Sequence, residues 1–410
     1  MTNEQTIQLN EIILELVRKL DITDTEFKTL TESYQAVGNF LSEESSPLHA
    51  YSPEIRPQGS FLLGTVVRPV SDDADIDIDL VCELHDKPAD WAQYNLKQAV
   101  GDRLKENKLY KGRLDKEGKR CWTIIYGDGE YHMDVLPSLM DKGYGVLLER
   151  SFSNDTLDDV KELAIRLTDN SLKPEYLYYK ETNSLYWPIT NPFGYAKWFL
   201  HNASRYRRAI KMFSLNEDIQ SVPKYDENRY PLQRIVQLLK RHRDIMFTDD
   251  DDNKPISIII TTLATHAYND ETDLMAGFKN VARNMVSHIE KRGEDYWIPN
   301  PVNKYENFAD KWKMYPVRRD NFFKWVDKLQ KDINTLESCA GKGLNAVQAQ
   351  LEIMFGEKVS KLALKSFGEN QRLLRENGKL KVTAGTATLG MAGSGTVAAH
   401  NFFGGEESDI

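Results

Sequence analysis

The sequence predicts an α+β fold, in which a mixed β-sheet with helices precedes a largely helical half. Strand signals gather early: residues 75–81 alternate acidic with apolar side chains, and residues 120–135 form two apolar runs around a Gly-Asp-Gly turn. Beyond about residue 190, apolar side chains recur at helical spacing instead. We therefore expect a core with N-terminal scaffold helices at 1–190, a helical domain at 191–380 and a flexible tail at 381–410.

The composition is typical of a water-soluble globular protein. Hydrophobic residues make up 40% and charged residues 28% of the 410 positions, enough for one large domain or two closely packed ones. No apolar run approaches the length of a membrane span, and the first ten residues are too polar for a signal peptide. The three cysteines, Cys82, Cys121 and Cys339, form no CxxC pair. We expect a cytoplasmic protein without a membrane partner.

The formal net charge of −9 restricts the substrate class. A dedicated binder of long nucleic acids usually carries the opposite sign. Free nucleotides fit better, because a few lysines and a metal ion can offset their charge.

Apolar periodicity, caps and turn residues predict the individual elements. Residues 6–20 have helical spacing, and Thr23 with Glu26 forms a capping box that opens a second helix to about Leu41. The remaining expected elements are a helix at 91–105, strands at 120–126 and 130–135 with Pro137 stopping the second, and helices at 195–210, 235–247, 319–337 and 343–365. Within 235–247, the basic residues 240–243 are consecutive and point to different sides, so we expect most of them in solvent.

The acidic residues of the first strand indicate a metal site. In an extended strand, Asp75, Asp77 and Asp79 share one face, while the intervening apolar residues share the other. Like charges this close need a cation among them, and Mg²⁺ takes carboxylate and phosphate oxygens together. Two metals require a further acid, which Asp134 supplies from a later strand. The alternation of side chains along a strand cannot by itself distinguish Asp75 and Asp77 from Asp77 and Asp79 as the metal-binding pair. For this acidic motif in isolation, an amphipathic strand whose acids face solvent is the alternative to a metal site.

A glycine-serine pair precedes this strand and is typical of a phosphate cradle. Gly59 allows close approach of a ligand to the backbone, and its neighbour Ser60 adds a hydroxyl. A cradle followed by a carboxylate pair is the equipment of metal-assisted phosphoryl transfer. The order of Gly59-Ser60, the Asp-x-Asp and Asp134 favours a metal site over a surface strand.

Two other polar features have simpler interpretations. His132 shares the face of Asp134 if the strand is regular. We expect a half-buried structural histidine, because Mg²⁺ prefers oxygen ligands; contact with a metal or nucleotide is the alternative. The four acids at 249–252 are expected to form an exposed loop; a metal loop is the alternative. No Ser-His-Asp or Cys-His set is evident.

At these motifs the sequence resembles a known family. Gly59-Ser60, Asp77-x-Asp79 and Asp134 resemble the core of polymerase-β-like nucleotidyltransferases. The longer strings QGSFLLGTVVRP and DIDLVCEL resemble the bacterial cGAS/DncV-like nucleotidyltransferases of the SMODS group (CD-NTases), which make cyclic oligonucleotide second messengers in CBASS anti-phage defence. The segment 298–312 is similar to one in oligoadenylate synthetases and their bacterial relatives.

The resemblance implies a polymerase-β-like core, a C-terminal helical domain and an active site in the cleft between them. It implies that Asp77, Asp79 and Asp134 are catalytic and hold two Mg²⁺ ions, for which Mn²⁺ can substitute. The donor triphosphate of ATP, GTP or another NTP would contact Gln58, Gly59 and Ser60, with Lys240 and Ser257 placed by the resemblance as further contacts. From the residues alone, Ser257 can equally cap a helix.

The resemblance also bears on partners. Many relatives have their C-terminus joined to targets by an E1/E2-like conjugating enzyme, and this tail contains Gly404-Gly405 but continues to Ile410. A disordered tail is the alternative. We expect a monomer that needs no nucleic acid. Two other functions stay open at this point: nucleotide transfer to RNA ends or proteins, and a non-catalytic nucleotide-sensing module.

Overall fold

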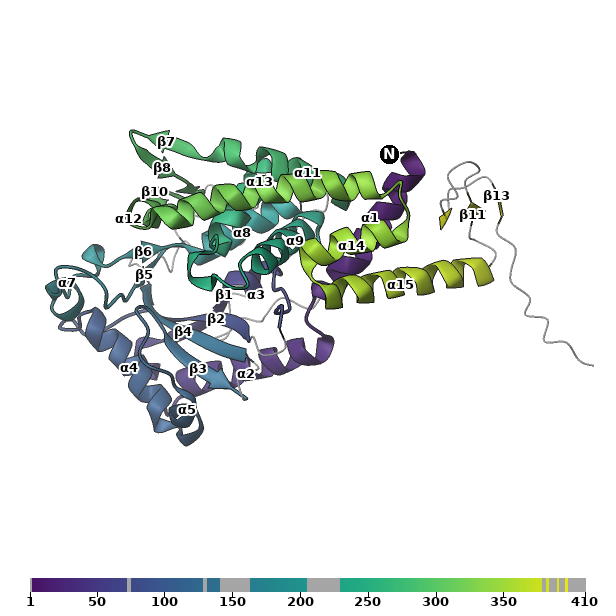
Figure 1. The fold of residues 1–410 in the computed structure, drawn as a ribbon. Coiled ribbons are helices and arrows are strands. Elements are labelled where there is room, and N and C mark those ends of the chain that lie inside the picture. Colours follow the sequence, from purple (N-terminus) through teal and green to yellow (C-terminus); the bar gives the residue numbers. More distant parts are fainter. Residues whose placement is uncertain are drawn as a thin grey trace, which may run out of the picture.

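The computed structural model places one mixed β-sheet against a large set of helices (Figure 1). It describes residues 2–71, 75–127, 131–140, 163–204 and 229–377, together with three short strands near the C-terminus. Those strands are β11 Lys381–Val382, β12 Leu389–Gly390 and β13 Gly395–Thr396. The rest of the predicted flexible tail, including Gly404-Gly405, lies outside the described residues.

The central sheet confirms the expected mixed topology. Its strands are β1 Pro53–Gln58, β2 Ile76–Leu84, β3 Trp122–Tyr126, β4 Tyr131–Met140, β5 Ile165–Leu167 and β6 Ile189–Thr190. They lie in the order β1-β2-β4-β5-β6, and β3 pairs with β4 beside β5. Only the β2–β4 pair of these strands is parallel. The two acid-bearing strands are therefore direct neighbours at the centre of the sheet.

The expectation that Pro137 ends its strand is wrong. β4 continues through Pro137 to Met140, in parallel register with β2 throughout. On the edge of β4 that faces away from β2, pairing with β3 ends at Val135 and pairing with β5 begins at Ser138. The Pro137 carbonyl accepts a hydrogen bond from Thr168 Oγ1 beyond β5, so the proline nitrogen faces this same edge. Because no ladder bond is required there, the missing N–H costs nothing.

Helices cover both faces of the sheet and form two hydrophobic cores. One core joins the sheet to α2 Asp24–Ser42, α4 Gln93–Glu106 and α5 Lys108–Arg113, which lie on its lower side in Figure 1. The other core joins the opposite face to the helical half and to α1 Asn3–Leu20. The predicted capping box at Thr23 and Glu26 is present at the start of α2.

The helical half follows β6. Its helices are α8 Pro192–Ala203, α9 Pro231–Met246, α10 Ser257–Ala267, α11 Leu274–Asn284, α12 Lys311–Met314, α13 Pro316–Cys339, α14 Leu344–Phe355 and α15 Glu357–Glu376. Small strand pairs are inserted at β7 Glu290–Arg292 with β8 Asp295–Trp297, and at β9 Pro299–Asn300 with β10 Asn303–Asn307. The single helix expected at 343–365 is wrong, because Gly356 adopts φ +93° and separates α14 from α15. None of the described helices has the length and apolar character of a membrane span.

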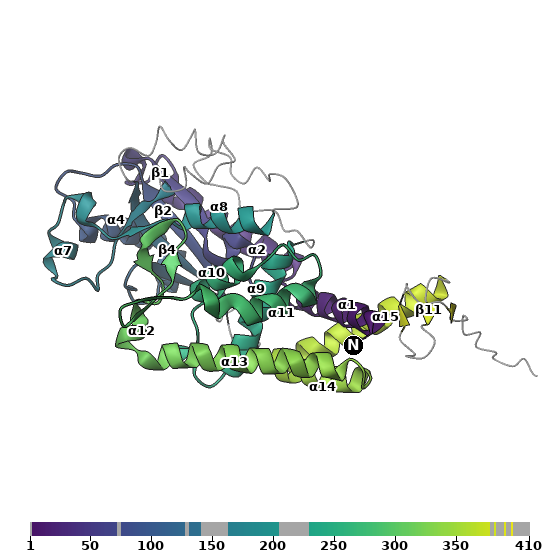
Figure 2. The same cartoon turned by 90° about the horizontal axis from the view of Figure 1, so that it is seen from above.

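The two ends of the folded chain meet. α1 packs along α15, and the two helices lie side by side in Figures 1 and 2. Gln371 donates a hydrogen bond to Glu11, and Asn370 donates one to Glu15. The first helix therefore belongs to the same hydrophobic core as the C-terminal helices, while the second packs on the sheet.

Helix α9 lies at the centre of the helical half. It contacts α1, α8, α10, α11, α13 and α14. The expectation that residues 240–243 are mostly solvated is therefore wrong: Lys240, Arg241, His242 and Arg243 are all buried. Each of the four side chains has at least one hydrogen-bond partner inside the protein: Arg241, for example, donates to the Arg68 carbonyl, and His242 pairs with Asp332. The run 249–252 is exposed, as expected.

Candidate active site

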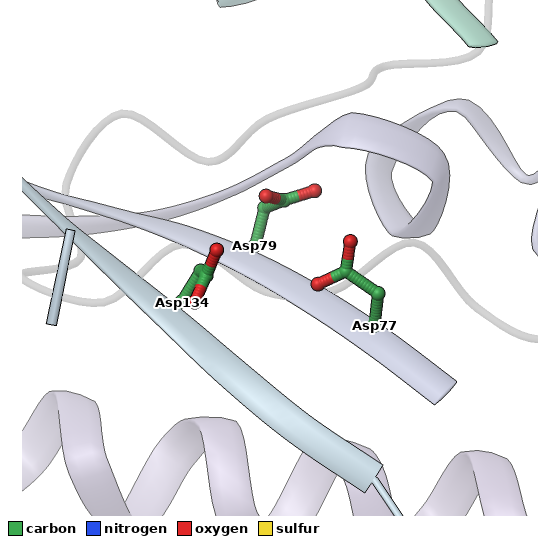
Figure 3. Close-up of side chains that lie close together, drawn as sticks. All are labelled: Asp77, Asp79 and Asp134. Carbon is green, nitrogen blue, oxygen red and sulfur yellow. The ribbon is translucent and has the colours of Figure 1, made fainter. Parts of the chain in front are cut away.

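Three carboxylates converge where β2 and β4 lie side by side (Figure 3). The parallel register sets Asp77 opposite His132 and Asp79 opposite Asp134. The intervening apolar residues of β2 point into the core below the sheet, so the acids point toward the helical half. One ligand atom from each of Asp77, Asp79 and Asp134 lies within 4.8 Å of those of the other two. The structure thus brings together the three acids that the sequence singled out.

The electrostatics of this cluster favour a bound cation. Burial, together with the neighbouring Asp77 and Asp134, raises the pKa of Asp79 to about 8. A carboxyl group held near two other acids is costly to ionise, and a divalent cation removes that cost. The three donors are all carboxylate oxygens, which suit Mg²⁺ or Mn²⁺. Thr123 on β3 donates a hydrogen bond of 2.5 Å to Asp134 Oδ1 and fixes that side chain.

Asp75 stands apart from the cluster. The His132 ring lies between Asp75 and Asp77, with Nδ1 2.6 Å from Asp75 Oδ2 and Nε2 3.1 Å from Asp77 Oδ1. The hydrogen bond to Asp77 is the largest of the effects that raise the pKa of His132 to about 9. Both neighbours accept, so both ring nitrogens donate. This geometry agrees with the choice of 77/79 over 75/77 as the metal-binding pair.

The glycine-serine turn closes over the acids. Gln58 ends β1 opposite Asp79, and the short helix α3 Gly59–Leu63 follows at once. Gly59 has φ +60°, and a Cβ built on it would lie 2.0 Å from Asp79 Oδ2. Only glycine therefore fits without moving the carboxylate. Ser60, the next residue, is half-buried in the same turn.

Lys240 and Ser257 are held by protein partners. The Lys240 ammonium donates to the Thr65 carbonyl oxygen at 3.1 Å and to Thr65 Oγ1 at 3.3 Å. Burial lowers the pKa of Lys240 to about 8, with Arg243 adding to the effect and Asp79 opposing it. Ser257 Oγ accepts a hydrogen bond from Arg243. Ser257 is the first helical residue of α10, and the N-cap position is occupied by Ile256, so Ser257 is not the N-cap residue of this helix.

A pocket of about 280 Å³ opens beside the acids. Both halves of the chain line it: Gln58, Gly59, Leu62, Leu63 and Asp79 from one side, and Thr190, Asn191, Pro192, Tyr195, Ile258, Asn300 and Phe308 from the other. An apolar pocket with a few oriented polar groups is typical of a small-molecule site.

Nine of the twelve pocket residues were not predicted from the sequence as site residues, and four of these nine, Asn191, Tyr195, Asn300 and Phe308, carry polar or aromatic side chains suited to a ligand. The segment 298–312 carried a family resemblance, which is the signal that points to Asn300 and Phe308. Asn300 is fixed by the Val302 amide, which donates to its Oδ1, and by its own donation to Glu306. Asn191 lies in the turn-rich segment 187–194, which by itself indicates a linker and which also resembles the start of the helical half in the SMODS group.

The fold and site together define a nucleotidyltransferase. The sheet holds three acids that can bind divalent metals, the Gly59 turn covers one of them, and a pocket of about 280 Å³ adjoins both. This combination can position a triphosphate and a hydroxyl for metal-assisted transfer.

Comparison with known proteins narrows the class. Residues 7–148 match the family described as the Second Messenger Oligonucleotide or Dinucleotide Synthetase domain, SMODS. The chain is 26% identical over 380 residues to a c-di-GMP synthase of Roseivirga ehrenbergii, covering 92% of each chain. It is 23% identical over 415 residues to the cyclic dinucleotide synthase CdnG of Bradyrhizobium diazoefficiens, covering 94% of this chain and 91% of that one. The chain is thus similar to SMODS domains over residues 7–148 and to two cyclic dinucleotide synthases along most of its length.

Solved structures share this fold. The structure of Bradyrhizobium diazoefficiens CdnG in complex with GTP superposes with a TM-score of 0.64 at 20% identity, covering 88% of this chain and 99% of that one. The GTP-bound form of Vibrio cholerae DncV gives a TM-score of 0.51 at 17% identity, covering 88% and 89%.

Proposed function

We propose that this chain is a cyclic oligonucleotide synthase, which joins two or more NTPs by nucleotidyl transfer and then closes the ring. The observation that carries this proposal is the convergence of Asp77, Asp79 and Asp134 beside the Gly59 turn and the pocket. Two relatives that align along more than nine-tenths of the chain are named as synthases of cyclic dinucleotides.

In this proposal Asp77, Asp79 and Asp134 hold two Mg²⁺ ions, with Mn²⁺ as a substitute. When bound, the ions neutralise the triphosphate and stabilise charge on the attacking and leaving oxygens. The donor set fits them, because it consists of carboxylate oxygens whose mutual repulsion a cation relieves.

The protein groups would act around this centre. The Gly59 backbone and Ser60, with Gln58, would hold the donor triphosphate, and Lys240 and Ser257 would contact it after releasing their present partners. Asp134 would accept the proton of the attacking ribose hydroxyl, whose oxygen forms a bond to the α-phosphorus. The bond from that phosphorus to the β-phosphate oxygen breaks, and pyrophosphate leaves. A second turn of the same chemistry closes the ring.

The pocket is the proposed seat of a nucleoside. Tyr195 and Phe308 offer aromatic surface for a base, with ring centroids 6.0 Å apart and nearly perpendicular. Asn191 and Asn300 offer oriented amide groups at the same wall. ATP and GTP are the proposed substrates, since two solved relatives were determined with GTP.

We also propose a biological setting. A role in CBASS anti-phage signalling is supported by the SMODS domain, with the enzyme acting as a cytoplasmic monomer on free nucleotides. The net charge of −9 supports independence from long nucleic acids. Conjugation of the tail by an E1/E2-like enzyme at Gly404-Gly405 would require trimming of the residues that follow.

Pyrophosphate release tests the assignment of the acids. Single Asn substitutions at Asp77, Asp79 and Asp134 should each abolish release from NTPs with Mg²⁺, while Asp102→Asn, on the exposed side of α4, should leave it unchanged. If Asp77→Asn or Asp79→Asn retained full activity while Asp75→Asn lost it, the choice of metal ligands on β2 would be wrong.

A further inference from the structure

We propose that His132 and Asp75 form a positioning pair, which holds the carboxylate of Asp77 in the orientation that a metal ion requires. This inference rests on the proposed function, in which Asp77 is a metal ligand. It assigns a role to His132 on β4 and to Asp75, which directly precedes β2.

The geometry places the imidazole between two carboxylates. His132 is the direct partner of Asp77 in the parallel register of β2 and β4, so the two side chains project together. Nε2 of the ring is 3.1 Å from Asp77 Oδ1, and Nδ1 is 2.6 Å from Asp75 Oδ2. Asp75 therefore fixes the plane of the ring, and the ring fixes one oxygen of Asp77. The second oxygen of Asp77 stays available to a metal.

Each of the three acids then has its own orienting neighbour. Asp79 is confined by the backbone of Gly59, whose missing Cβ leaves just enough room for Oδ2. Asp134 accepts the Thr123 hydroxyl at 2.5 Å. Asp77 is the most exposed of the three, so packing alone does not fix its side chain. The hydrogen bond from His132 supplies that constraint.

His132 acts in this account through Asp77 and not as a ligand. Both of its ring nitrogens are engaged by carboxylates, and the ligand atoms of the metal cluster come from the three acids alone among the residues described. Removing the hydrogen-bond partner of a metal ligand typically lowers metal affinity by roughly 10- to 100-fold.

Direct metal binding tests the pair without any need for turnover. Mn²⁺ is titrated into the full-length chain without nucleotide, and free Mn²⁺ is measured by electron paramagnetic resonance. His132→Ala should raise the Kd for Mn²⁺ by roughly 10- to 100-fold. His132→Gln, which can still donate to Asp77, should recover part of the loss. Asp75→Asn should raise the Kd by a smaller factor.

A second histidine provides the matched control. His85 pairs with Glu54 at the far end of β2, with Nε2 3.1 Å from Oε2. His85→Ala removes a half-exposed histidine-carboxylate contact from the same sheet and should leave the Kd unchanged. Thermal unfolding of each variant separates local effects from loss of the fold, and Asp75→Asn gives an exposed second probe if His132→Ala unfolds.

The outcomes distinguish failure of this inference from failure of the proposed function on which it rests. Wild-type affinity in His132→Ala, with weakened binding in Asp79→Asn/Asp134→Asn, would overturn the positioning pair alone. Tighter binding in His132→Ala would overturn it too, because the ring would then compete with the metal. Unchanged binding in the double Asn variant would remove the metal site itself, and the proposed function with it.

Discussion

Replacing Gly59 by alanine should slow catalysis strongly while costing only the stability that a left-handed backbone conformation explains. An alanine Cβ would lie 2.0 Å from Asp79 Oδ2. Since carbon and oxygen normally approach to about 3.3 Å, the carboxylate must move by about 1.3 Å. A misplacement of about 1 Å at a reacting centre can cost on the order of 100-fold in rate. The backbone cost is separate: alanine at this φ of +60° should lose about 1–2 kcal/mol of unfolding free energy.

Gly293 provides the matched control. It has a similar φ of +65°, but a Cβ there would meet nothing within 4 Å. Gly293→Ala should therefore show the same loss of stability in urea unfolding, with unchanged pyrophosphate release. If Gly59→Ala kept a rate within about threefold of Gly293→Ala, far from the expected 100-fold loss, the contact with Asp79 would not govern catalysis.

Two further predictions concern stability. Gly101→Ala on α4 should destabilise the fold by about 1–3 kcal/mol in urea unfolding, because its Cβ would lie 2.3 Å from the Trp122 ring. Gly112→Ala is the control: a Cβ there would meet open space, so the substitution should be neutral or stabilising by up to about 1 kcal/mol. Burial holds the pKa of His242 below its ordinary value, so the unfolded chain binds a proton that native His242 does not. This contribution to stability is full above about pH 6.5 and falls as the pH drops below it. Lowering the pH from 7.5 to 5.5 should therefore reduce the free energy of unfolding less in His242→Gln than in the unsubstituted protein. An identical pH dependence in the two proteins would contradict this.

Local patterns predicted much of the site. Because successive side chains of an extended strand point to opposite faces, the alternation along β2 was enough to predict that Asp77 and Asp79 share one face. The hairpin of β3 and β4 then brought Asp134 into the same sheet, although the parallel register opposite Asp79 follows from the whole topology. The capping box of α2 was equally local.

The rest depended on contacts between distant segments. Helix α9 looked amphipathic with a solvated basic run, yet helices from both ends of the chain surround it and bury Lys240 and its neighbours. The pocket joins Gln58 to Phe308, which are 250 positions apart in the numbering. No single window of sequence contains both walls, so residue patterns alone could not show that Asn191 and Asn300 line one pocket.

One measurement addresses the central claim most directly. The purified protein is incubated with the four labelled NTPs and Mg²⁺, treated with phosphatase and analysed by mass spectrometry. The account predicts a phosphatase-resistant cyclic product that is absent in the Asp77→Asn/Asp79→Asn variant, and its mass identifies the bases. A linear or protein-attached product, or a cyclic product that persists in that variant, would contradict the assignment of this site as a cyclic oligonucleotide synthase.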